Sequence, residues 1–216
     1  MYEENRRKRR LILIGIVLVI LLLFVFAFRY FQKGKQRSIA GIRAPIQTVA
    51  TGEKHIKRKG YELTLDYLYA YDIEGLVITT KNYNGSSLGD ELSPKDVGLA
   101  WGNVAKYNTL LGFHWAAKYR ALELNEDENS WGKKQDFVGS IEDALKQISN
   151  NHLIVLDSSI KESVKKIKVG DHIRIKGYLV NIEGDNSIKQ FSWYSSTSRD
   201  DTGCEVILVE SVDWLD

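Results

Sequence analysis

One apolar segment constrains this chain more than any other feature of its sequence. Residues 11–28 read LILIGIVLVILLLFVFAF, without a charged or hydrogen-bonding side chain. As an α-helix this segment would be about 27 Å long, close to the roughly 30 Å hydrocarbon core of a bilayer. It is longer than the core of a signal peptide, roughly 7 to 15 residues, and residues 29–33 offer no small-residue cleavage site. We therefore predict an uncleaved transmembrane helix at residues 11–31, in contact with the lipid bilayer.

The orientation of this helix is predicted from the energy of moving charge rather than from counting charges. Five basic residues at positions 6–10 precede the segment, and five more follow it by residue 43, so the positive-inside count is a tie. Moving the first group outward would oppose an inside-negative potential, at about 2.3 kcal/mol per charge per 100 mV. We predict a single-pass cytoplasmic membrane protein with its N-terminus inside and its C-terminal domain extracytoplasmic.

Charge divides the remaining chain into unlike parts. The 216 residues carry 30 Lys+Arg and 28 Asp+Glu, a net charge of +2. Because residues 1–40 hold nine basic and two acidic side chains, residues 41–216 are net acidic, and they show no basic–aromatic stripe. This argues against nucleic acid as a partner. We expect a basic tail at residues 1–10, the transmembrane helix at 11–31, a basic juxtamembrane linker at 32–60 and a soluble domain at 61–216.

Local patterns after residue 60 predict an α+β domain. Two Ser-x-x-Asp signatures, at Ser93 and Ser140, are typical of helix N-termini and predict helices that begin at Pro94 and Ile141, the second ending at residues 149–151. Alternating or continuous apolar runs predict strands at residues 61–69, 76–80, 113–124, 153–156, 164–169, 172–180 and 206–209. We predict an N-terminal transmembrane helix followed by a soluble domain with a small β-barrel or curved antiparallel sheet and about two helices.

Three segments carry a resemblance to a known group of proteins. They are SNNHLI at residues 149–154, VGDHIRIKGYLV at 169–180 and SSTSRDDTGCEVILVESVDWL at 195–215. Together they resemble the C-terminal half of an uncharacterised family of bacterial single-span membrane proteins with an extracytoplasmic domain. The resemblance covers roughly the last third of the chain and implies a bacterial cell-envelope protein. It implies no particular activity.

The few cysteine and histidine residues limit the chemistry that the sequence predicts. A single cysteine, Cys204, excludes an intramolecular disulfide and any multi-cysteine metal site. The four histidines lack close pairings such as H-E-x-x-H, so we predict no metal and no cofactor. Cys204 precedes a β-rich run, which favours a buried, inert thiol. Residues 85–89 match G-x-S-x-G but lack the strand–turn–helix context of a nucleophilic serine, which favours a loop.

Polar residues in three places are candidates for a binding site. His114 lies between two large aromatic residues, and His152 follows a run of asparagines. The polar run at residues 195–204 is suited to an anion through its arginine or a cation through its aspartates. Each place also has a purely structural interpretation, as half-buried hydrogen-bonding groups or as a hairpin loop. The candidate binding residues are His114, Trp115, Asn151, His152, Arg199, Asp200 and Asp201, and no catalytic residue is assigned.

Two functions of different classes follow from these observations. The leading hypothesis is a membrane-anchored extracytoplasmic interaction or accessory module of an envelope complex, with a protein partner, because no complete catalytic constellation is visible. The rival is a membrane-anchored envelope hydrolase that uses His114, His152 and the loop from Arg199 to Asp201. The sequence favours the non-enzymatic hypothesis. We also predict that a specific binding surface lies where residues 195–203 approach His152.

Overall fold

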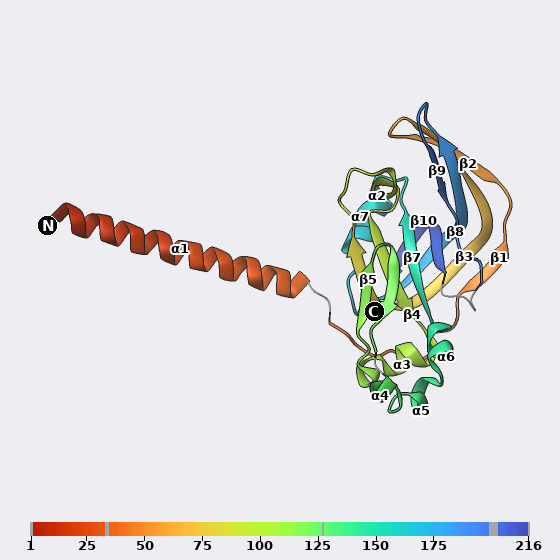
Figure 1. Ribbon diagram of the computed structural model, residues 1–216, viewed down its shortest axis with the longest axis horizontal. Helices are drawn as coiled ribbons and strands as arrows, with labels where there is room; N and C mark the ends of the chain where they lie inside the picture. Colours follow the sequence, from red (N-terminus) through yellow and green to blue (C-terminus); the bar gives the residue numbers. More distant parts are fainter. Residues whose placement is uncertain (1, 33–34, 127, 199–202, 216) are drawn as a thin grey trace. The chain divides into compact units, whose positions relative to one another are not determined.

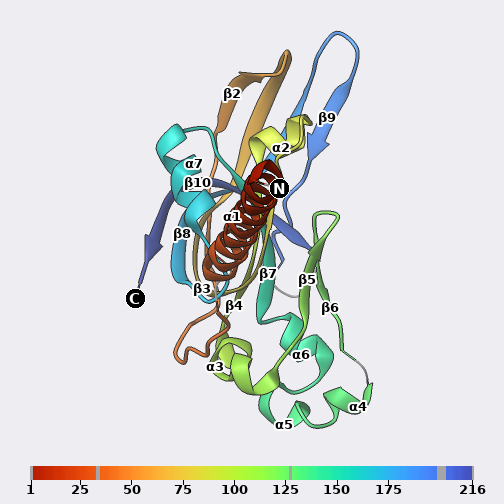
Figure 2. The ribbon, with the colours of Figure 1, turned by 90° about the vertical axis from the view of Figure 1, so that its left-hand side faces the viewer.

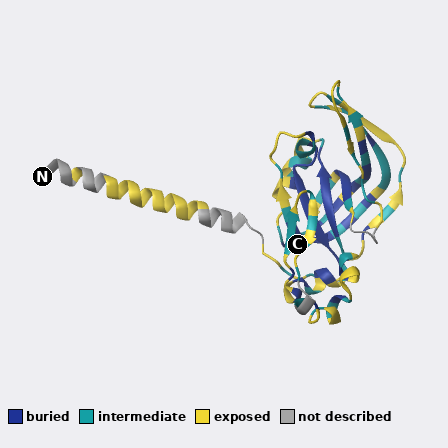
Figure 3. Ribbon diagram, in the orientation of Figure 1, coloured by how far each residue is buried: buried dark blue, intermediate teal, exposed yellow. Residues whose placement is uncertain are grey.

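The computed structural model describes residues 2–32, 35–126, 128–198 and 203–215, in two compact units, Met1–Gly34 and Lys35–Asp216. The first unit contains helix α1 (Tyr2–Gln32), whose side chains from Leu11 to Val25 are exposed (Figure 3). Among the helices of the described residues, none combines the length and the apolar character that crossing a membrane requires.

The second unit consists mainly of strands, with short helices between them (Figure 1). Its strands are β1 (Ile46–Val49), β2 (Glu53–Arg58), β3 (Tyr61–Asn82), β4 (Lys95–Ala100), β5 (Trp115–Lys118), β6 (Ala121–Leu124), β7 (Ile148–Ile154), β8 (His172–Asp185), β9 (Gln190–Trp193) and β10 (Cys204–Trp214). Its helices are α2 (Leu88–Leu92), α3 (Gly102–Leu111), α4 (Glu128–Trp131), α5 (Gln135–Val138), α6 (Ile141–Leu145) and α7 (Ser158–Lys166).

One mixed sheet organises this unit. Its described strands number eight, in the order β1-β3-β4-β7-β10-β8-β9, with β2 also paired to β3. Strand β3 pairs with β4 and also with β8, so the path through β4, β7, β10 and β8 returns to β3. Strands β7 and β10 are parallel, and the other described pairings are antiparallel. Strands β5 and β6 form a separate hairpin.

Strand β3 is continuous over 22 residues, whereas the sequence predicts two strands, at residues 61–69 and 76–80, joined by a turn at residues 72–75. Strand β8 runs beside it and pairs with the residues of that predicted turn, including Glu74 and Gly75. A Cβ atom at Gly75 would lie 2.9 Å from the Cβ atom of Leu99. The glycine therefore lets the core side chain of β4 pack directly against the backbone of β3, instead of making a turn.

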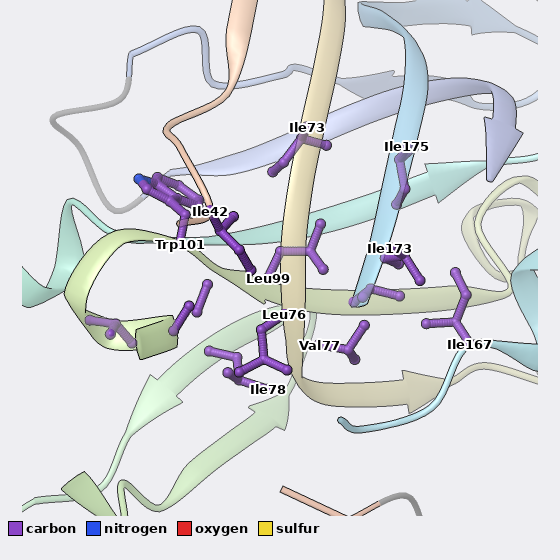
Figure 4. Close-up of a cluster of buried hydrophobic side chains, with 14 of the residues drawn as sticks. Ile42, Ile73, Leu76, Val77, Ile78, Leu99, Trp101, Ile167, Ile173 and Ile175 are labelled. Carbon is purple, nitrogen blue, oxygen red and sulfur yellow. The ribbon is translucent and has the colours of Figure 1, made fainter. Parts of the chain in front are cut away.

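The apolar side chains of the sheet form two buried clusters. The larger core joins β3, β4 and β8 through residues such as Ile73, Leu99 and Ile175, each 0% exposed (Figure 4). The smaller core contains Ile154 of β7 and Val206 of β10 and includes the buried side chains of α2. Full burial of one such side chain contributes about 1.5–3 kcal/mol, so the two cores dominate the stability of the unit.

Helices α3, α4, α5 and α6 gather at one end of this unit, opposite the β2–β3 and β8–β9 hairpins (Figures 1 and 2). The N-terminus of α6 confirms the prediction at Ser140. The Ser140 side chain accepts from the Asp143 N–H at 3.1 Å, and the Asp143 carboxylate accepts from the Ser140 N–H at 2.9 Å. This reciprocal pair satisfies backbone donors that the first turn of a helix leaves free.

The predicted fold class is wrong. It combined a transmembrane helix with a small β-barrel or curved antiparallel sheet and about two helices. The structure instead has a large mixed sheet with several helices, and no helix of its described residues is long and apolar enough to span a membrane. The parallel pair β7–β10 departs from an antiparallel sheet because α7, β8 and β9 lie between these strands in the sequence, which gives the chain room for a crossover.

Three local predictions also fail, each because distant residues decide the conformation. The segment after Pro94 is strand β4 rather than a helix, and all six of its residues are buried between β3 and β7. Residues 149–151 lie inside β7 instead of ending a helix, and the first half of the predicted strand at 164–169 is the end of α7. Tertiary pairing and burial outweigh local propensity at these sites.

Residues 35–60, all of which fall in the predicted linker at 32–60, belong to the second unit. They include β1 and β2, and Ile42 is buried in the larger core. The Gln36 side-chain amide donates to the carbonyl of Ile78 at 3.0 Å. These contacts tie the segment to the sheet.

Candidate functional site

Strand β7 brings a set of polar side chains together because it lies between β4 and β10. His152 is opposite Asp96 of β4, and Asn150 is opposite Cys204 of β10. Residues two apart on a strand point to the same face, so these four side chains share one face of the sheet. With Arg120 they form what we call the buried cluster: Asp96, Arg120, Asn150, His152 and Cys204.

The imidazole of His152 is held in one position. Its Nδ1 lies 2.9 Å from Oδ1 of Asp96, and the two side chains are only 3% and 1% exposed. The Trp193 ring packs against the imidazole, with 4.8 Å between ring centroids. Because Nδ1 faces the carboxylate, Nε2 is the ring nitrogen left for another group.

Cys204 of β10 is a diagonal neighbour of His152 on this face, because it pairs with Asn150 while His152 pairs with Val206. The side-chain Nδ2 of Asn150 lies 3.3 Å from the Cys204 sulfur, and the pKa of the thiol also depends on hydrogen bonding with His152. Burial would raise the pKa of Cys204, but the hydrogen bonds to His152 and Asn150 outweigh burial and lower it. Burial would lower the pKa of His152, but hydrogen bonds to Asp96 and Cys204 outweigh it and raise this pKa. Both shifts favour a thiolate beside an imidazolium.

Arg120 joins the two ends of the buried cluster. It lies in the tight turn between β5 and β6, where Tyr119 and Arg120 have φ values of 52° and 64°. Its guanidinium donates to Oδ1 of Asp96 and to Oδ1 of Asp90, both at 2.7 Å. Its carbonyl accepts from Nδ2 of Asn150 at 2.9 Å. The left-handed backbone conformation is uncommon for these residue types. It places the guanidinium and the backbone carbonyl of Arg120 against the sheet.

The arrangement supplies the parts of a nucleophilic site. A nucleophilic site needs a nucleophile, a base and a group that orients the base, and the thiol of Cys204, the imidazole of His152 and the carboxylate of Asp96 are groups of these three kinds. Cys204 is half-buried, whereas the imidazole and carboxylate behind it are shielded from water. Within the described ranges, no group of three or more His, Cys, Asp and Glu residues is placed to hold a metal ion.

The candidate residues from the sequence lie in different places. The His114 side chain is 83% exposed, and its Nδ1 is 3.8 Å from Oε1 of Glu126. Trp115 belongs to β5 and packs edge-on against Phe113 in the larger core. Asn151 points to the opposite face of β7 from His152 and donates to the carbonyl of Val97. Of these four, only His152 belongs to the buried cluster.

The polar loop at residues 195–203 is described only at its two ends. Arg199, Asp200 and Asp201 lie outside the described residues. The N–H of Ser196 donates to the carbonyl of Cys204 at 2.9 Å, and Oγ of Ser195 accepts from the N–H of Val206 at 3.0 Å. The described beginning of the loop is therefore fixed to the start of β10, where Cys204 lies.

Sequence reasoning missed four members of the buried cluster. It assigned Asp96 to a helix cap and treated Cys204 as inert. It gave no role to Arg120, and it considered Asn150 only as part of the polar run before His152. The useful signals were the single cysteine and the histidine that follows two asparagines, but Cys204 lies 54 positions from Asn150, and Arg120 lies 24 positions from Asp96. Only pairing of β7 with both neighbouring strands brings these residues together.

Comparison of the chain with protein-family models, with curated proteins and with solved structures gave no match.

Proposed function

We propose that the second unit is a thiol-dependent hydrolase in which Cys204 is the nucleophile, His152 the general base and acid, and Asp96 the residue that orients His152. The observation that carries this proposal is the strand pairing that places the only cysteine of the chain on the same face as a buried, carboxylate-bound histidine of the neighbouring strand. A histidine held by a carboxylate activates a thiol, and the three roles need no particular order along the chain.

The reaction would proceed in two steps. The Cys204 thiolate attacks the carbonyl carbon of an ester, thioester or amide, and a carbon–sulfur bond forms. The bond to the leaving group breaks, and the leaving group takes the proton of the His152 imidazolium. Water then attacks the thioester while His152 takes one of its protons. A carbon–oxygen bond forms, the carbon–sulfur bond breaks, and the carboxylic acid leaves the regenerated thiolate–imidazolium pair.

Asn150 and Arg120 support these steps without reacting. Asn150 Nδ2 is a neutral donor beside the sulfur, where it stabilises negative charge on the thiolate. Arg120 neutralises the carboxylates of Asp90 and Asp96 and fixes Asn150 through its carbonyl. These contacts keep the nucleophile and its base aligned before substrate arrives, which lowers the cost of reaching the transition state.

The pH dependence of cysteine alkylation tests the proposal directly. With one cysteine in the chain, iodoacetamide gives a single adduct that mass spectrometry can follow. Since only the thiolate reacts, a lowered pKa moves the midpoint of the rate–pH profile below that of N-acetylcysteine. We expect His152→Gln to raise this midpoint and Cys204→Ala to abolish hydrolysis of p-nitrophenyl butyrate.

His172→Gln is the matched control. His172 also contacts a carboxylate at 2.9 Å, that of Glu74, but it lies at the start of β8 and outside the buried cluster. Its substitution should leave the midpoint where it is in the wild type. A wild-type midpoint at or above that of N-acetylcysteine would contradict the proposal without any variant, and thermal unfolding shows whether each variant is folded.

The other sequence-based hypotheses stay predictions. They are the interaction or accessory role in an envelope complex, the resemblance to the bacterial family, and the localisation at the cytoplasmic membrane with the N-terminus inside.

A further inference from the structure

A cavity of about 300 Å³ opens beside the buried cluster. Its walls include Leu122 and Leu124 of β6, Ile141 and Leu145 of α6, and Ile148 of β7. Asn150 and Gly203 also line it, and these residues flank the sulfur of Cys204 in space and in sequence. A molecule in this cavity therefore lies next to the proposed nucleophile.

Asn150, which lines the cavity, has one buried polar atom without a partner. Asn150 is 4% exposed, and its Oδ1 has no hydrogen-bond partner among the described residues. The orientation of the amide is settled by its neighbours, because the carbonyl of Arg120 can only accept and must face Nδ2. Oδ1 can only accept, so a buried N–H or O–H donor on a ligand would remove the cost of leaving it unpaired.

Glu126, the charged residue that lines the cavity, does not require a ligand of opposite charge. The carboxylate of Glu126 is only 5% exposed and is already bound by Lys134, Ser130 and the N–H of His114. Apart from Ser149, Asn150 and Gly203, the remaining residues of the wall have aliphatic side chains, which favours a neutral aliphatic group. The cavity is small, near the lower end of the roughly 300–1,000 Å³ range of ligand pockets.

We propose that this cavity binds the aliphatic side chain of a neutral, amide-bearing substrate, such as a leucine-like residue of a peptide, whose N–H donates to Oδ1 of Asn150. This inference rests on the proposed function and names its substrate class. The side chain occupies the space between β6 and α6, and the adjacent carbonyl carbon lies at the Cys204 sulfur. The acceptor on Asn150 selects an N-acylated amino acid residue over a plain fatty acyl chain.

Protection of Cys204 from iodoacetamide tests this inference. N-acetyl-leucinamide, which has no thiol or amine to react with iodoacetamide, should slow alkylation in a saturable way, and N-acetyl-aspartamide should not. The N-methylated, N,N-dimethylamide analogue of N-acetyl-leucinamide keeps the side chain but has no N–H. Because it leaves Oδ1 unpaired, it should protect about tenfold more weakly.

Two variants test whether N-acetyl-leucinamide binds in this cavity. Protection is the ratio of the alkylation rates of each protein without and with N-acetyl-leucinamide. Ile141→Asp places a charge in the cavity wall and should remove protection, whereas Ile188→Asp changes an equally apolar side chain that is 85% exposed and lies outside the cavity. Protection should persist in Ile188→Asp.

The outcomes separate the two proposals. A lowered midpoint of the alkylation profile without protection by N-acetyl-leucinamide would overturn the substrate assignment and leave the thiol hydrolase standing. Equal protection by N-acetyl-aspartamide, or full protection in Ile141→Asp, would also overturn the assignment. An ordinary midpoint would overturn the hydrolase and this inference together.

Discussion

His152 and His172 each contact a carboxylate at 2.9 Å, but their surroundings differ. The His152 pair belongs to the buried cluster, where both side chains are at most 3% exposed. The His172 pair belongs to what we call the exposed ladder, formed by Asp72, Glu74, His172 and Arg174 along β3 and β8. There the side chain of His172 is 13% exposed and that of Glu74 is 39% exposed.

The two arginines repeat this contrast. Arg120 in the buried cluster holds two carboxylates, and that of Asp96 is 1% exposed. Arg174 in the exposed ladder binds Asp72 through two nitrogens at 2.7 and 2.5 Å, but its side chain is 39% exposed. Histidine–carboxylate and arginine–carboxylate pairs thus occur both in the exposed ladder, in contact with solvent, and in the buried cluster, shielded from solvent. Burial prevents water from replacing a lost partner, so only the buried cluster holds its groups in one arrangement.

The largest expected effect is the loss of Asp96. Asp96→Ala leaves Arg120 and His152 in a buried site without their shared acceptor, so the free energy of unfolding should fall by about 3–5 kcal/mol. Urea denaturation followed by circular dichroism measures this change. A loss below about 1 kcal/mol would mean that the buried cluster behaves like the exposed ladder, and the comparison would fail.

The second effect concerns Lys95, a buried charge beside Asp96 on β4. Its ammonium donates to the carbonyls of Lys165 and Ile167 at the end of α7, and burial lowers its pKa to about 8. Between pH 8 and 10.5 the unfolded chain binds more protons than the folded protein, so this group makes the protein more stable as the pH rises. The contribution should reach about 2 kcal/mol.

The comparison of wild type with Lys95→Met isolates this term. The difference between their free energies of unfolding should grow in favour of the wild type from pH 8 to pH 10. Other groups that titrate in this range cancel in the difference. A difference that stays flat with pH would show that water reaches Lys95 and would weaken the contrast between buried and exposed charges.

The smallest effect belongs to the exposed ladder. The hydrogen bond from Arg174 lowers the pKa of Asp72, so its stabilising contribution is present near neutral pH and disappears as the pH falls through the acid range. Asp72→Asn should cost about 0.5–1 kcal/mol at pH 7 and less in high salt. Urea denaturation at pH 7 and pH 3 checks the pH dependence, and the same measurement at pH 7 with added salt checks the salt dependence. A cost equal to that of Asp96→Ala would remove the distinction between the two regions.

Some elements of the fold could be predicted because their causes are local. The capping box at Ser140 needs only residues three apart, and the alternating residues from His172 to Val180 lie in strand β8 as expected. The segment after Ser93 carries the same kind of signature, and Ser93 Oγ does reach Oδ1 of Asp96 at 3.4 Å, yet β4 forms there. A local contact is compatible with either structure, and the pairing with β3 and β7 decides between them.

The candidate site shows where sequence reasoning stops. The sequence by itself determined that the chain has one thiol and an apolar N-terminal segment, and that polar residues precede His152. Only the tertiary structure decided that Cys204 is a neighbour of His152 and that Asp96 faces its other side, because both contacts depend on the strand order β4-β7-β10. Strand order follows from the burial of two cores built from distant segments, and such burial depends on the whole chain rather than on any local pattern.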